Sequence, residues 1–170
     1  MKTMRLFSLL TLATLVVNAH AVKIENTGAW TFEKFENGGL ESRVFEAEGA
    51  LTRPTKDTDL PKPVIYLRTL DAAEFAGSAN KAEWRGHILN SPSNRQIVLS
   101  ENIFKKNGRF HYMAEYQTDT GTENMLHSAL LATVIDGRIQ VLVFDARRAV
   151  YMKQKGAILD LFKSISISEK

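Results

Sequence analysis

Three ionisable side chains in the C-terminal half, His111, Glu115 and His127, are of the types that hold metal ions or exchange protons. Imidazole and carboxylate groups are among the ligands that zinc takes from proteins. If the segments that carry them are neighbouring strands, and if odd-numbered residues pair with odd-numbered ones, all three side chains lie on one face. One such register places Glu115 opposite His127. These three residues are therefore candidate metal ligands.

The spacing along the chain limits this hypothesis. Residues four apart on a strand are ~13 Å apart at ~3.3 Å per residue. His111 and Glu115 therefore cannot ligate one ion unless the strand is bent or bulged, and Glu115 with His127 is the feasible pair. The alternative is a half-solvated sheet face with an ordinary His–Glu contact between strands. On balance the sequence assigns no metal and no other cofactor.

Other reactive groups provide no catalytic site. The chain has no cysteine, which excludes a thiol nucleophile, thiolate metal sites and iron–sulfur clusters. It also lacks the Gly-x-Ser-x-Gly and His-Glu-x-x-His motifs of hydrolases. We assign no catalytic residue and predict that the protein is not an enzyme.

Two adjacent cations, Arg147 and Arg148, begin a segment with helical periodicity that extends to Lys163. Asp145 precedes them and is expected to cap this helix, because an aspartate near the N-cap satisfies free backbone amides. Cations at a helix N-terminus oppose the helix dipole, so a carboxylate or a partner is expected to hold them. Arg147 and Arg148 are therefore candidate partner-binding residues.

The strands expected to position these residues are defined by two turns. Asn107-Gly108 and Asp136-Gly137 are typical of two-residue hairpins, because both turn positions need positive φ. The first turn pairs Phe104 with His111, and the second pairs Val134 with Ile139. The pairing predicts one apolar face on the first hairpin, formed by Ile97, Leu99, Ile103, Phe110, Tyr112, Ala114 and Tyr116.

The N-terminal half is expected to contain strands at 29–35, 43–51 and 63–69, followed by a helix in two pieces. Asp71 with Glu74 resembles a capping box that opens the first piece, and Asn80 with Glu83 opens the second, which ends near Leu89. Between the second and third strands, residues 53–63 hold three of the four prolines and form a loop. Long loops carry function more often than other segments, so this loop is a candidate contact surface.

The order of these elements resembles the PsbP-like family, which includes the bacterial DcrB-like proteins. The resemblance is carried by FHYMAEYQTDTGTENMLHSALLATVIDGRIQVLVF (110–144), a helix at 147–162 and a closing Ser-Ile-Ser-Ile (164–167). It implies an α+β fold, a single antiparallel sheet with helices packed on it as an α/β/α sandwich. It also implies a binding or assembly function. No residue of this chain matches a family site residue, so none is carried over.

Residues 1–21 are expected to form a signal peptide. Lys2 and Arg5 precede the apolar run at 6–17, and Ala19-His20-Ala21 is a small–x–small cleavage site. Cleavage after Ala21 leaves residues 22–170 as a single domain with no stable membrane anchor. We therefore expect a periplasmic or secreted protein.

Charge excludes one class of partner. The full chain carries 22 Lys and Arg against 19 Asp and Glu, and loss of Lys2 and Arg5 leaves 20 against 19. A nearly neutral mature chain lacks the clustered basic face that nucleic acid requires. We predict a non-enzymatic module that binds another protein of the cell envelope, as an assembly factor or as an inhibitor or immunity protein. The alternative is a periplasmic carrier of a small molecule or metal.

Overall fold

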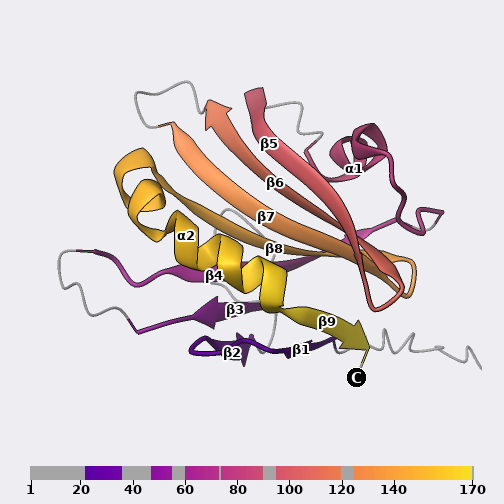
Figure 1. The fold of residues 1–170 in the computed structure, drawn as a ribbon, viewed down its shortest axis with the longest axis horizontal. Coiled ribbons are helices and arrows are strands. Elements are labelled where there is room, and N and C mark those ends of the chain that lie inside the picture. Colours follow the sequence, from indigo (N-terminus) through magenta and orange to yellow (C-terminus); the bar gives the residue numbers. More distant parts are fainter. Residues whose placement is uncertain are drawn as a thin grey trace, which may run out of the picture.

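The computed structural model describes residues 22–35, 47–54, 60–72, 74–89, 95–119 and 125–169. Within these ranges the chain forms nine strands and two helices (Figure 1). In chain order they are β1 (Val22–Glu25), β2 (Thr31–Lys34), β3 (Gly49–Thr52), β4 (Val64–Asp71), α1 (Lys81–Ile88), β5 (Arg95–Lys106), β6 (Arg109–Asp119), β7 (Leu126–Ile135), β8 (Arg138–Arg147), α2 (Arg148–Ser164) and β9 (Ser166–Glu169). The expected signal peptide and part of the expected strand at 43–51 lie outside the described residues.

Seven strands form one antiparallel sheet in the order β2-β3-β4-β8-β7-β6-β5. Strands β1 and β9 form a separate antiparallel pair, in which Ile24 lies opposite Ile167. The expected α+β fold, with helices packed on an antiparallel sheet, is confirmed, and the β1–β9 pair is an addition to the single sheet that was expected. The apolar side chains of this pair pack on the main core. The C-terminal strand was predicted, whereas β1, only four residues long, was not.

Both predicted hairpin turns are confirmed. Asn107 and Gly108 have φ of 52° and 78°, and Asp136 and Gly137 have φ of 49° and 70°. Phe104 pairs with His111 and Val134 with Ile139, as the turns predict. The long strands β5 to β8 therefore form a meander whose registers are fixed by two tight turns.

The predicted apolar face of β5 is wrong at one end. The pairing of β5 with β6 shifts between Val98 and Ser100, which is a β-bulge, so the alternation set at the Asn107-Gly108 turn stops there. The side chains of Ile97 and Leu99 were expected in the core. They are 53% and 51% exposed instead.

Helix α1 is shorter than predicted. Its N-cap is Asn80, whose side chain accepts a 2.9 Å hydrogen bond from the Ala82 amide and donates one to Glu83. The first expected helical piece is absent from the described part of 71–79, because β4 stays paired as far as Asp71, opposite Arg138. Asp71 therefore ends a strand and does not cap a helix.

Helix α2 begins one residue later than predicted, and Asp145 does not cap it. Asp145 belongs to β8 and pairs with Ser128, while Arg147 takes the N-cap position without a side-chain cap bond. At the other end of the helix, Lys106 Nζ donates hydrogen bonds of 2.6–3.1 Å to the backbone oxygens of residues 163–165. This cation satisfies carbonyl groups that the helix C-terminus leaves unpaired. The contact joins the helix to strand β5.

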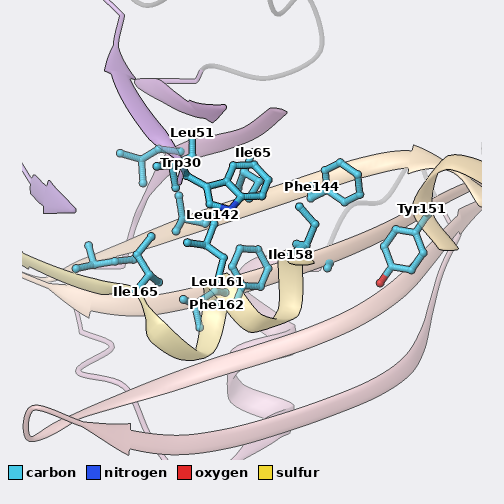
Figure 2. Close-up of a cluster of buried hydrophobic side chains, with 14 of the residues drawn as sticks. Trp30, Leu51, Ile65, Leu142, Phe144, Tyr151, Ile158, Leu161, Phe162 and Ile165 are labelled. Carbon is cyan, nitrogen blue, oxygen red and sulfur yellow. The ribbon is translucent and has the colours of Figure 1, made fainter. Parts of the chain in front are cut away.

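The sheet is covered on both faces, as the expected α/β/α sandwich requires. One core lies between the sheet and α2, and Figure 2 shows the helix side chains packed among those of the strands. Its fully buried members include Leu51, Ile65, Leu131, Leu142, Ile158 and Phe162. A second core lies on the opposite face, where Trp84 of α1 stacks on Tyr112 at 5.8 Å. The tyrosines expected in the core, Tyr112 and Tyr116, are buried.

Candidate functional site

The structure places His111, Glu115 and His127 on the α2 face of the sheet, as the odd-to-odd pairing predicts. The register differs by two residues from the one that would pair Glu115 with His127. Glu115 lies opposite Ala129, and His127 lies opposite Gln117. The pairing of β6 with β7 therefore keeps the predicted odd-to-odd parity. Glu115 and His127, however, lie diagonally across the two strands and not directly opposite each other.

The carboxylate of Glu115 is bound by other side chains of the protein. Its carboxylate accepts hydrogen bonds from Tyr151 at 2.7 Å and Ser100 at 2.9 Å, and Lys155 Nζ lies 2.6 Å from it. Burial alone would raise the pKa of this carboxyl. The hydrogen bonds from Lys155, Tyr151 and Ser100 outweigh burial and lower the pKa below its ordinary value. The ionised carboxylate of Glu115 therefore links strand β6 to helix α2.

Each histidine is held separately. His111 is 3% exposed, stacks on Phe104 at 5.3 Å, and lies with Nδ1 3.2 Å from the Arg109 carbonyl oxygen. His127 is 6% exposed, and its Nε2 lies 3.2 Å from the side-chain nitrogen of Gln117. Burial lowers the pKa of both, and the charge of Arg148 lowers that of His127 further. Both rings are therefore held in the neutral form near pH 7.

The three candidate ligands are not brought together. Across the described residues, no cluster of three or more His, Cys, Asp or Glu side chains could hold a metal ion.

Arg147 and Arg148 are exposed at the start of α2, and neither forms an ion pair with another described residue. Arg147 lines a pocket of about 340 Å³ that also contains Lys62 and Asp145. Burial raises the pKa of Asp145, with the positive charge of Arg68 acting in the opposite direction. Asp145 was expected to cap the helix, and it instead brings a carboxyl group to the pocket beside Arg147.

Sequence reasoning missed a surface at the free edge of β5. Among the described strands, β5 has β6 on one side and no strand on the other. We call the exposed side chains of Ile97 and Leu99, together with this outer edge, the β5 surface. Three consecutive apolar residues, Ile97 to Leu99, break the alternation of a half-buried strand, and this was the signal that could have revealed the bulge.

The fold is that of an α+β domain, and the residues that the structure describes contain no cluster that could hold a metal ion. No family model matches the sequence, and no curated protein matches it. The structure is similar to that of LpqN, involved in cell envelope biogenesis of Mycobacterium tuberculosis, with a TM-score of 0.51 and 15% identity. The match covers 89% of this chain and 87% of LpqN.

Two further structures are similar. PA94 of Pseudomonas aeruginosa, a protein of unknown function, matches with a TM-score of 0.53 and 12% identity, over 81% of this chain and 96% of PA94. The cyanobacterial PsbP protein CyanoP from Synechocystis sp. PCC 6803 matches with a TM-score of 0.48 and 9% identity, over 89% of this chain and 95% of that one. The PsbP-like α+β fold is confirmed. No helix in the described ranges is long and apolar enough to cross a membrane.

Proposed function

We propose that the protein is an exported, non-enzymatic module that binds another protein of the cell envelope, and that the β5 surface makes the contact. The observation that carries this proposal is the exposure of Ile97 and Leu99, at 53% and 51%, side by side on an edge strand. Exposed apolar side chains on an edge strand favour association with a partner. The unpaired backbone of that edge could add a strand of the partner to the sheet.

A basic group lies at the far end of a row of residues that starts at this surface. Ile97 lies opposite Gln117, and Gln117 lies opposite His127, so these residues form one row across β5, β6 and β7 on the α2 face. The Arg148 charge acts on His127 at the end of the row. His127 itself is buried, so a partner reaches only the two ends of this row: the exposed Ile97 on β5, and Arg148 at the start of α2, which forms no ion pair with another described residue. Such a surface suits a partner segment with an apolar residue followed by a carboxylate.

Of the two roles considered, we favour an assembly factor over an inhibitor or immunity protein. LpqN, a protein of similar fold, is involved in cell envelope biogenesis. Export is supported by the sequence of residues 1–21, in which Lys2 and Arg5 precede an apolar run and a small–x–small cleavage site. N-terminal sequencing of the protein from a periplasmic or culture fraction tests export directly, and Val22 is the expected first residue.

Affinity capture tests the binding function. The tagged mature protein is incubated with envelope extract at low salt, beside Leu99→Asp and Met152→Asp variants. Met152 is the matched control because it is 60% exposed and lies on α2, outside the β5 surface. The proposal expects a stoichiometric partner that Leu99→Asp loses and Met152→Asp retains. Absence of a stoichiometric partner, or equal retention by both variants, would contradict it.

A further inference from the structure

A second site lies at the opposite edge of the molecule from the β5 surface. A pocket of about 520 Å³ opens between α2, the residues before β2 and the two described ends of the Pro-rich loop. Its volume falls within the range of about 300–1,000 Å³ that is common for small-molecule sites. The lining residues in the described part of the chain are Ala29, Trp30, Arg53, Pro54, Leu60, Pro63, Lys153, Gln154, Ala157 and Ile158.

The floor of the pocket is apolar and rigid. Trp30 is 6% exposed and Ile158 is fully buried, and both belong to the core cluster drawn in Figure 2. Pro63 is also buried, and its ring restricts the backbone beside the pocket. This buried floor supports the more accessible lining residues Pro54, Leu60 and Ala157, on which an apolar ligand body can lie without reordering the site.

The rim of the pocket is positively charged. Arg53 enters from the end of β3, and Lys153 enters from α2. Both side chains are exposed, and neither forms an ion pair with a described residue. No aspartate or glutamate is among the described residues that line the pocket. Two cations with no carboxylate beside them among the described lining residues favour an anionic group at the mouth.

Gln154 lies between this pocket and the pocket beside Arg147, and it lines both. Its side chain is 8% exposed, and its Nε2 donates a 2.9 Å hydrogen bond to the Pro61 carbonyl oxygen. That bond fixes the amide orientation, because Nε2 faces the carbonyl. The other amide atom, Oε1, is buried and has no hydrogen-bond partner among the described residues. A buried acceptor without a partner is destabilising, so a ligand that supplies a donor gains affinity here.

We propose that this pocket binds a small amphiphilic acid. Arg53 and Lys153 hold the anionic head, Gln154 Oε1 accepts a hydrogen bond from a hydroxyl or amide of the ligand, and the apolar body lies against the accessible apolar side chains above the floor, those of Pro54, Leu60 and Ala157. The proposal is independent of the β5 surface, because β2 and β5 are opposite edges of the sheet. It would give the protein the second role anticipated from the sequence, that of a small-molecule carrier.

The test uses the mature protein and three ligands of one chain length: 3-hydroxydecanoate, decanoate and decylamine. Binding is followed by isothermal titration calorimetry and by tryptophan fluorescence, since Trp30 lines the pocket while Trp84 is buried on the other face. We expect 3-hydroxydecanoate to bind more tightly than decanoate, and decylamine not to bind. The fluorescence change should be absent in Trp30→Phe. Equal binding of the amine and the acids would overturn the proposal.

Three variants locate the contacts. Lys153→Glu is expected to weaken binding of both acids by about tenfold or more, because it replaces an attractive charge with a repulsive one. Lys81→Glu is the matched control, since it makes the same charge change on α1, outside the pocket. Gln154→Met should abolish the preference for 3-hydroxydecanoate over decanoate. Unchanged affinity in Lys153→Glu, or an unchanged preference in Gln154→Met, would contradict the assigned site.

Discussion

Tyr151 of helix α2 donates a 2.7 Å hydrogen bond to the carboxylate of Glu115 on strand β6. The same carboxylate receives Lys155 one helical turn further along α2. Two contacts from one helix to one side chain fix how α2 lies across the sheet. Glu115, a candidate metal ligand from the sequence, therefore holds helix α2 in place on the sheet.

Replacement of Glu115 by glutamine should lower the free energy of unfolding at pH 7 by about 1.5 kcal/mol, through loss of charge-assisted hydrogen bonds. We expect no larger loss of stability, because Lys155 is 36% exposed and solvent screens its charge. Urea unfolding measures this difference. Asp160→Asn on the same helix is the matched control, because Asp160 is 80% exposed, and it should change stability little.

The effect of Glu115→Gln should depend on pH. The folded-state pKa of Glu115 is lowered, so its contribution is fully present above the unfolded value of about 4.3. The contribution is lost as pH falls through the folded pKa. The wild-type protein and the variant should therefore converge in stability in strong acid. A constant difference from pH 7 to pH 2 would show that the charge of Glu115 is not the cause.

The two buried histidines should make the protein sensitive to milder acid. The pKa of both His111 and His127 is lowered, so the unfolded chain binds protons below about pH 6.5 while the folded chain does not. Stability should fall as pH decreases through this window. In His127→Gln, the dependence of unfolding free energy on pH between 7 and 5 should be shallower. An unchanged dependence would exclude His127 as a source.

Turn chemistry accounts for what the sequence predicted well. Asn107-Gly108 and Asp136-Gly137 need positive φ, and this local requirement fixes the register of β5 with β6 as far as the bulge, and of β7 with β8. The face shared by His111, Glu115 and His127 followed from those registers and from the parity of one loop. The predicted N-cap at Asn80 also depends only on neighbouring residues, and it is confirmed.

The errors arose where pairing between distant segments overrides local signals. Asp71 has the pattern of a helix cap, yet β4 continues through it because Arg138 lies opposite. Asp145 likewise precedes a helix but is held in β8. The bulge beside Leu99 is a property of the pair of strands, and the pocket lined by Trp30 and Lys153 joins segments far apart in sequence.

Two glycines should respond oppositely to alanine. At Gly49, a Cβ atom would lie 2.6 Å from the Glu33 carbonyl oxygen and 2.7 Å from the Phe32 ring, so Gly49→Ala should destabilise by about 2 kcal/mol. At Gly156 in α2, a Cβ atom meets nothing within 4 Å, and Gly156→Ala should stabilise by about 1 kcal/mol. Thermal unfolding of both variants checks the signs. A stabilised Gly49→Ala protein would contradict the packing of β2 on β3.

The most direct test of the proposed function is photo-cross-linking in living cells, with a photoreactive amino acid at position 99 of the full chain and, in a second strain, at position 152. The first position lies on the β5 surface, and the second is exposed on α2. We predict one discrete cross-linked envelope protein from position 99 and none from position 152. No cross-link at position 99, or the same products from both positions, would contradict binding through β5.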